Sequence, residues 1–253
     1  MKKVLVLGLL VAVAGLSAPL WSQGAAPATQ PAGEAKKYAF DSNESLAGWK
    51  ITGDVSVDMA KNREGKGGSM KIGPKGKAVL KVGDTDASGK LELYVFDDGK
   101  VPADSNAGRS GPCWGLLQSD GKALAIGAIY AKYLKGSTTY AVGDSADGKN
   151  FYRVVQYVNT PRTPAGWHKW TFDWDPEKGL KILHNDKDLN PDPAKPRFKW
   201  EQIGIKGFSS IAIWGDSGKG DEQTVWVADV SVTPGGPVTN PPKGPAPKSQ
   251  PAK

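Results

Sequence analysis

Three carboxylates alternate along one short stretch of the chain, Asp173, Asp175 and Glu177. Residues two apart project from the same face of an extended strand, so these side chains would share one side. Retaining glycosidases hold a nucleophile and an acid at a separation of about 5 Å, which such spacing can provide. Pro176 interrupts the run and favours a turn after Asp175. We therefore expect a solvated strand face entering a turn, with glycoside hydrolysis as the alternative.

A second group of oxygen-bearing side chains has the chemistry of a calcium site. Asp144, Asp147 and Asn150 stand at positions 1, 4 and 7 of a loop that contains Gly148. Calcium prefers carboxylate and amide oxygens, but the loop lacks the full spacing and the closing glutamate of an EF-hand. An ordinary polar turn is the alternative interpretation.

Two histidines and one cysteine complete the candidate reactive groups. His168 and His184 flank a predicted turn and could face each other, but two histidines without a third ligand make a poor zinc site. A structural role or a pH-sensitive surface pair is expected. Cys113 is the only cysteine, so no internal disulfide can form, and we expect it to be a small buried apolar side chain.

Tryptophans offer flat apolar faces against which a sugar ring can stack. Four of them adjoin glycine, proline or charged residues in predicted loops: Trp114, Trp167, Trp200 and Trp214. Large aromatic side chains also dominate the interior of β-sandwiches, which is the competing explanation. We expect one or two of the four to be exposed and to bind carbohydrate.

The elements that position these residues are predicted to be strands. Trp170, Phe172 and Trp174 alternate with polar residues, the period of a half-buried strand, and residues 175–179 supply a turn before alternation resumes. This pattern predicts a β-hairpin over 166–185. Three large aromatics on one strand face need a second layer to cover them, so the hairpin implies a two-sheet sandwich.

The rest of the body consists of short alternating runs separated by turn signals, which is typical of an antiparallel sandwich or barrel. In the last predicted strand, residues 225–232, simple alternation places Trp226 on the same face as Val230. The first and last strands of compact β-domains often lie side by side. We therefore expect residues 38–40 to pair near residues 227–232.

Both ends of the chain differ in composition from this body. Residues 1–24 combine two lysines with a short apolar run and small residues, the pattern of a removed secretory signal peptide rather than a membrane span. Residues 25–37 are predicted to be a low-complexity linker, residues 38–234 a single domain, and residues 235–253 a disordered tail rich in proline and lysine.

The net charge of +7 belongs largely to these ends. The leader contributes two of the seven charges, the linker a net one and the tail three, which leaves +1 for residues 38–234. Nucleic-acid binding proteins cluster lysine and arginine on the folded surface, so a nearly neutral body argues against a nucleic-acid partner. Patterning says nothing about the oligomeric state.

The stretch Gly-Trp-His-Lys-Trp-Thr-Phe-Asp-Trp at 166–174, with the following strand at 180–186, resembles laminin G-like and other concanavalin A-like jelly-roll domains. The opening at 40–49 and the closing strand at 226–232 are similar to the ends of secreted carbohydrate-binding jelly rolls. The resemblance implies an all-β, two-sheet antiparallel jelly-roll sandwich. It also implies a structural calcium near Asp41 and Asp229, on the paired terminal strands. One departure is the Asn185-Asp186-Lys187-Asp188 stretch, where laminin G-like domains continue into Asp-Gly.

Together these features predict a secreted or envelope-associated, non-enzymatic module that binds a polysaccharide or cell-surface glycan. A hydrolase of the concanavalin A-like fold and a structural envelope module without a small ligand are the alternatives, because one fold hosts many functions.

Overall fold

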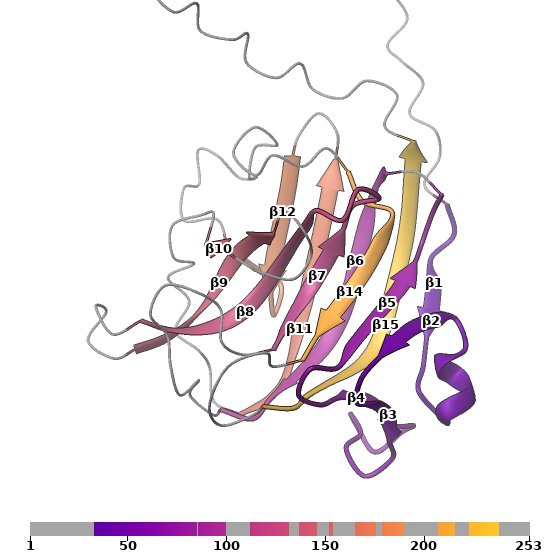
Figure 1. Ribbon diagram of the computed structural model, residues 1–253, viewed down its shortest axis with the longest axis vertical. Coiled ribbons are helices and arrows are strands. Elements are labelled where there is room, and N and C mark those ends of the chain that lie inside the picture. Colours follow the sequence, from indigo (N-terminus) through magenta and orange to yellow (C-terminus); the bar gives the residue numbers. More distant parts are fainter. Residues whose placement is uncertain are drawn as a thin grey trace, which may run out of the picture.

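The computed structural model describes residues 33–84, 86–99, 112–131, 137–145, 152–153, 165–175, 179–189, 207–215 and 223–237. Two antiparallel β-sheets pack face to face in these residues, and they overlap in the view of Figure 1. The predicted two-sheet antiparallel jelly-roll sandwich is thereby confirmed. A single turn of 3-10 helix, η1 (Asn43–Leu46), precedes the strands of the second sheet.

The first sheet contains the predicted hairpin and both terminal strands. Its strands, in spatial order, are β13 (Lys187–Asp188), β12 (Gly179–His184), β11 (Gly166–Asp175), β6 (Ala87–Asp97), β15 (Val225–Pro237), β4 (Ser69–Ile72) and β3 (Val55–Asp58), with β1 (Lys36–Tyr38) also paired to β15.

The second sheet is formed from the middle of the chain and two earlier strands. Its order is β10 (Tyr152–Arg153), β9 (Ser137–Ser145), β8 (Ala123–Ala131), β7 (Cys113–Leu117), β14 (Ser210–Trp214), β5 (Lys77–Lys81) and β2 (Trp49–Thr52).

The hairpin over 166–185 is confirmed, with Phe172 opposite Ile182 in the β11–β12 register. Trp170, Phe172 and Trp174 are completely or almost completely buried and contact residues of the second sheet in one continuous core. Trp170, for example, lies with its ring centroid 5.3 Å from that of Trp114 on β7. The aromatic face of β11 therefore fills the space between the sheets, as its alternation predicted.

The terminal strands pair as predicted, with Lys36 opposite Val232 and Tyr38 opposite Val230. Gly33 N–H also donates to Pro234 O at 3.0 Å, so the two ends of the described chain lie together. Strand β1 begins inside the segment predicted to be a linker, and β15 runs to Pro237, beyond the predicted domain end. In both extensions the backbone groups form hydrogen bonds with a neighbouring strand, which the composition of these segments does not predict.

The face assigned to Trp226 by simple alternation was wrong. The pairing between β15 and β6 shifts by one residue between Ala228 and Ser231, and Asp229 adopts a φ of 47° in this bulge. A one-residue bulge reverses which residues face inward on its two sides. Val227 and Val230 therefore both point into the core, whereas Trp226 lies on the outer face of the first sheet.

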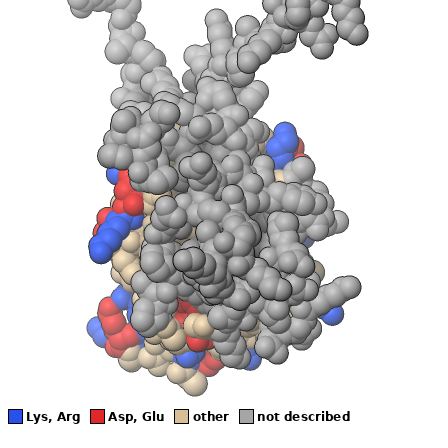
Figure 2. Space-filling view, turned by 90° about the vertical axis from the view of Figure 1, so that its left-hand side faces the viewer, with Lys and Arg blue, Asp and Glu red and all other residues tan. Residues whose placement is uncertain are grey.

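A second buried apolar cluster lies on the outer face of the second sheet. It consists of four small side chains and one tryptophan: Cys113, Ala123, Ala125, Ala212 and Trp214. Cys113 is a free, buried thiol, as predicted. Acidic and basic side chains lie close together where the charged surface of the described residues is visible in Figure 2.

Candidate functional site

Of the four tryptophans predicted to bind carbohydrate, the structure leaves one partly exposed. Trp114 is 4% exposed in the core and Trp214 is 5% exposed in the second cluster, so neither offers a ring face to a ligand. Trp167 is partly exposed on the outer face of the first sheet. Trp200 lies outside the described residues. Only Trp167 therefore remains as a described stacking residue from the predicted set.

The three alternating carboxylates do not surround a described cleft. Asp173 lies on the outward face of β11, directly between Lys90 of β6 and Lys181 of β12 in the strand register. Asp175 is opposite Gly179 at the end of the strand, and Glu177 lies outside the described residues. Asp173 therefore lies on the charged outer face of the strand. The sequence predicted this location in preference to a catalytic one.

The predicted calcium ligands occupy two separate places. Asp41 is exposed beside the bridge between Phe40 and Gly68. Asp229, at the β15 bulge, accepts a hydrogen bond at 2.6 Å from Arg63 Nε, so an arginine already balances its charge. Within the described part of the chain, no three histidine, cysteine or acidic side chains form a group able to hold a metal.

The other proposed calcium loop starts at Asp144, whose backbone pairs with Tyr152 in the second sheet. Asp147 and Asn150 lie outside the described residues. Calcium binding therefore stays a prediction at both places.

Three aromatic rings form a row on the outer face of the first sheet, and we call Trp167, Phe96 and Trp226 the aromatic platform. Phe96 is the centre, with ring centroids 5.4 Å from Trp167 and 5.9 Å from Trp226, both in edge-to-face geometry. The register explains the row, because Phe96 is paired with Trp167 on β11 and with Trp226 on β15. All three side chains are partly exposed, and the two edge-to-face contacts set neighbouring rings nearly perpendicular, so a ligand would meet ring edges as well as ring faces.

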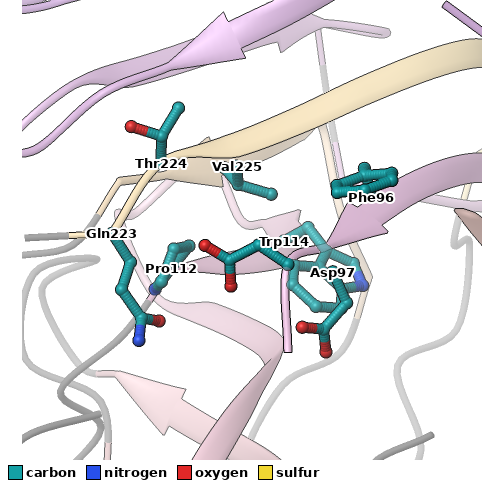
Figure 3. Close-up of a pocket in the computed structure, with 8 residues that line it drawn as sticks. Phe96, Asp97, Pro112, Trp114, Gln223, Thr224 and Val225 are labelled. Atoms are coloured by element: carbon teal, nitrogen blue, oxygen red, sulfur yellow. The ribbon is translucent and has the colours of Figure 1, made fainter. Parts of the chain in front are cut away.

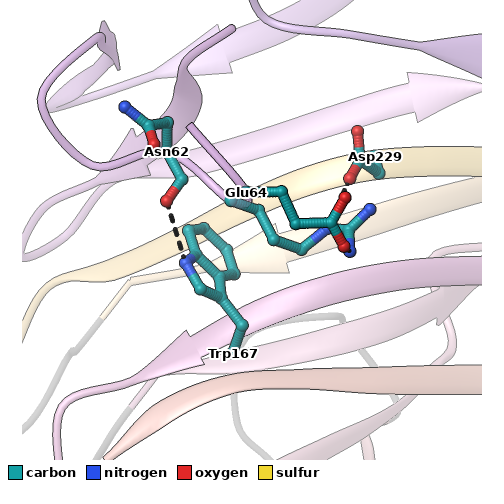
Figure 4. A network of polar contacts seen from close by, with 5 residues as sticks. Asn62, Glu64, Trp167 and Asp229 are labelled. Carbon is teal, nitrogen blue, oxygen red and sulfur yellow. Dashed lines mark hydrogen bonds and ion pairs between the residues drawn. The ribbon is translucent and has the colours of Figure 1, made fainter. Parts of the chain in front are cut away.

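Residues 59–66, part of the connection between β3 and β4, lie along this platform. Lys61 Nζ stands 3.6 Å above the Phe96 ring centroid, and the indole of Trp167 donates to Asn62 O at 3.2 Å. Arg63 lies 3.9 Å over the ring of Tyr94 and pairs with Asp229. Figure 4 shows the hydrogen bond between Trp167 and Asn62, and the contact of Asp229. Consecutive residues of one segment thus fix the orientation of the aromatic side chains below it.

Trp226 is fixed by a carboxylate at its far edge. Its Nε1 donates to Asp58 Oδ2 at 2.9 Å, and this hydrogen bond is the main reason that the pKa of Asp58 lies below its ordinary value. Asp58 Oδ1 accepts from the backbone N–H groups of Ala60 and Lys61. The same carboxylate therefore anchors both the platform and the start of the segment 59–66.

A small polar pocket lies next to the platform at the end of β6, and Phe96 belongs to both the platform and the pocket lining. The pocket encloses about 20 Å³, enough for roughly one water molecule, and Figure 3 shows its lining. Asp97, Asp98 and Gln223 supply polar groups, and the indole Nε1 of Trp114 has no hydrogen-bond acceptor among the described residues. Asp97 itself is anchored, because Tyr140 Oη donates to it at 2.5 Å and Gly99 N–H donates at 2.8 Å. Donor and acceptor groups of this kind suit a single hydroxyl group or water.

The two histidines face each other, but they are buried rather than at the surface. Their ring centroids are 5.1 Å apart, and His184 stacks on Trp170 at 4.4 Å with an interplanar angle of 19°. Asn185 Nδ2 lies 3.2 Å from His168 Nδ1 and 3.4 Å from His184 Nε2. The sequence left a structural role and a surface pair open, and their burial contradicts the surface pair.

The amide of Asn185 contacts a ring nitrogen of each imidazole. Lys169 N–H donates to Asn185 Oδ1 at 2.9 Å, so the amide NH₂ must face both rings and donate to them. Both facing ring nitrogens are then acceptors. Burial and the neighbouring His168 lower the pKa of His184 to about 4, in agreement with this arrangement.

Sequence reasoning missed Phe96 and Trp226 as site residues. Phe96 had a usable signal, because Tyr94 and Phe96 alternate with the apolar Leu93 and Val95 and so occupy the opposite strand face. Trp226 had none, since its position depends on the bulge at Asp229.

No family model and no curated protein matches the sequence. Among solved structures, the chain is similar to the lectin UEA-II complexed with galactose, at 13% identity and a TM-score of 0.48, over 81% of this chain and 99% of that one. It is also similar to a Bacteroides ovatus mixed-linkage glucan GH16 protein in complex with a product, at 13% identity and a TM-score of 0.47, over 79% and 99% of the two chains.

A third similar structure is domain 4 of AbnA, a GH43 extracellular arabinanase from Geobacillus stearothermophilus, in complex with arabinotriose. The identity is 12% and the TM-score 0.47, over 81% of this chain and 94% of that one. At such identities, and with TM-scores below 0.5, these likenesses assign neither a ligand nor an activity. Within the described residues, no helix is both long and apolar enough to cross a membrane.

Proposed function

We propose that this chain is an exported, non-enzymatic β-sandwich module that binds a polysaccharide or cell-surface glycan at the aromatic platform. The observation that carries the proposal is the row of Trp167, Phe96 and Trp226, partly exposed on the outer face of the first sheet. Large apolar side chains face outward together here and stay partly exposed, and apolar groups gathered at a surface mark interaction sites.

The neighbouring groups favour a sugar over a purely apolar partner. The pocket lined by Asp98 and Gln223 begins at Phe96, so a ring stacked on the platform can direct a hydroxyl group toward it. Ligand sites combine apolar walls with a few oriented polar groups in this way. Export follows from the leader at residues 1–24, which lies outside the described structure.

The decisive experiment removes one ring of the platform and measures polysaccharide binding. Trp167→Ala deletes a stacking face, and Leu183→Ala is the matched control, because Leu183 is a partly exposed apolar residue of β12 in the same sheet. Affinity electrophoresis in gels that contain a panel of neutral and acidic polysaccharides measures retardation without a prior choice of ligand. Loss of one aromatic contact of about 1.5 kcal/mol should weaken binding roughly tenfold.

The alternatives give different results in the same experiment. If no polysaccharide retards the wild-type chain, the proposal fails and a structural envelope module takes its place. If new reducing ends accumulate in the incubated polysaccharide and Asp173→Asn stops their release, the protein is a hydrolase. If both Trp167→Ala and Leu183→Ala bind like the wild type, the glycan site lies elsewhere on the chain.

A further inference from the structure

One lysine places a positive charge over the aromatic platform, a feature that a site for neutral sugars does not need. Lys61 Nζ lies 3.6 Å from the ring centroid of Phe96 and 5.1 Å from that of Trp226. Its backbone N–H donates to Asp58 Oδ1 at 3.2 Å, so the residue is held at both ends. The ammonium group therefore has a defined position over the centre of the platform.

The other cations around the platform have acidic neighbours. Arg63 pairs with Asp229 at 2.6 Å, and Lys169 pairs with Asp186 at 3.0 Å. The charge of Lys71 helps to lower the pKa of Asp58, after the hydrogen bond from Trp226. Among the described residues, Lys61 forms no salt bridge, in contrast to Arg63 and Lys169. Among the described side chains, its positive charge lies against the faces of the Phe96 and Trp226 rings.

An ammonium group in this environment can bind an anion. Ring faces stabilise a cation but accept few of its hydrogen bonds, so N–H donors of Lys61 stay available to a ligand. Charge-assisted hydrogen bonds between ammonium and carboxylate are about twice as strong as neutral ones. A sugar that carries a carboxylate would satisfy Lys61 while its ring contacts the flanking indoles.

We propose that the platform selects an acidic glycan whose sugar units carry carboxylates, with Lys61 as the residue that determines this specificity. The inference rests on the proposed glycan-binding function and names its ligand class. It also separates two sources of charge, because Lys61 belongs to the folded domain whereas most of the net positive charge belongs to the terminal segments.

The test uses one polymer in two charge states. Polygalacturonate carries a carboxylate on each sugar, and its highly methyl-esterified form has the same backbone with those charges removed. Titration calorimetry of the full mature chain with each polymer compares the wild type with Lys61→Met, which retains an apolar stem without the charge. Lys50→Met is the matched control, because Lys50 is an exposed lysine of β2 in the other sheet.

The wild type should bind polygalacturonate about tenfold or more tightly than the esterified polymer, given a charged hydrogen bond of about 1.5–3 kcal/mol. Lys61→Met should lose most of that preference, and Lys50→Met should keep it within about twofold. Equal wild-type affinity for the two polymers, with both weakened by Trp167→Ala, overturns the acidic-ligand inference and leaves the glycan-binding proposal intact. Equal losses in the two lysine variants also overturn it, because they indicate diffuse charge attraction. Absence of binding to either polymer and to the whole polysaccharide panel removes both proposals.

Discussion

Acidification should destabilise this protein through His184, which is 4% exposed and stacked on Trp170. Asn185 Nδ2 donates toward His184 Nε2, so a proton on that nitrogen would set two donors against each other. Burial and His168 lower the pKa of His184 to about 4, Asp97 opposes this shift and Lys187 adds to it. The folded state therefore requires a neutral imidazole.

The direction and size of the effect follow from the two pKa values of His184. The unfolded chain takes up the proton near the ordinary value of 6.5, and the folded chain only near 4. Between these values the unfolded state binds more protons, so the free energy of unfolding is highest above pH 6.5 and falls as the pH falls toward 4. The difference amounts to about 2 kcal/mol at pH 5 and about 3 kcal/mol at pH 4.

Urea denaturation followed by tryptophan fluorescence at pH 7 and pH 5 measures this loss. His184→Phe retains a ring to stack on Trp170 and removes the titrating nitrogen, and the comparison is made within each variant so that its baseline stability cancels. The wild type should lose about 2 kcal/mol more than His184→Phe between the two pH values. If both proteins lose the same amount, the buried imidazole is not the acid-sensitive group and the reasoning is refuted.

Three further predictions concern the core and the single thiol. Trp170→Ala should lower the free energy of unfolding by about 3–5 kcal/mol in urea titrations, and a loss below about 1 kcal/mol would show that the hairpin is not central to the core. Gly115→Ala places a methyl group 2.1 Å from Leu124 O and should cost at least about 2 kcal/mol, whereas Gly48→Ala, with its nearest atom at 3.7 Å, should cost less than 1 kcal/mol. A reducing agent should leave the Tm of the monomer unchanged, because Cys113 is the only cysteine, and a clear drop would contradict a fold free of disulfides.

Local alternation was enough to predict the hairpin and the fold class. Trp170, Phe172 and Trp174 must be covered because they bring a large apolar area to one strand face, and a second sheet is the arrangement that covers them. The pairing of the first and last strands was also predictable, since closing the domain places Tyr38 beside Val230. These properties depend on a period of two and on chain closure, which the sequence carries directly.

The candidate site depended on information that alternation does not contain. Trp114 and Trp214 adjoin glycine in the sequence and resemble loop residues, yet cross-strand pairing places both on one strand pair and buries them. Simple alternation put Trp226 on the same face as Val230, and the one-residue bulge at Asp229 instead places it on the outer face beside Phe96. Beyond a bulge, every residue of the strand lies on the opposite strand face from the one that alternation predicts. The partner strands decide where the bulge forms.

The sequence by itself therefore determined the two-layer arrangement, which aromatic face is buried, and that no disulfide holds the domain together. Only the tertiary structure decided which residues meet on the surface. The platform joins β6, β11 and β15 with the segment 59–66, so Lys61 reaches Phe96 from 35 positions earlier in the chain. Contacts of that kind arise from the register between strands and the path of a connecting segment, and neither is fixed by the residues of any one strand.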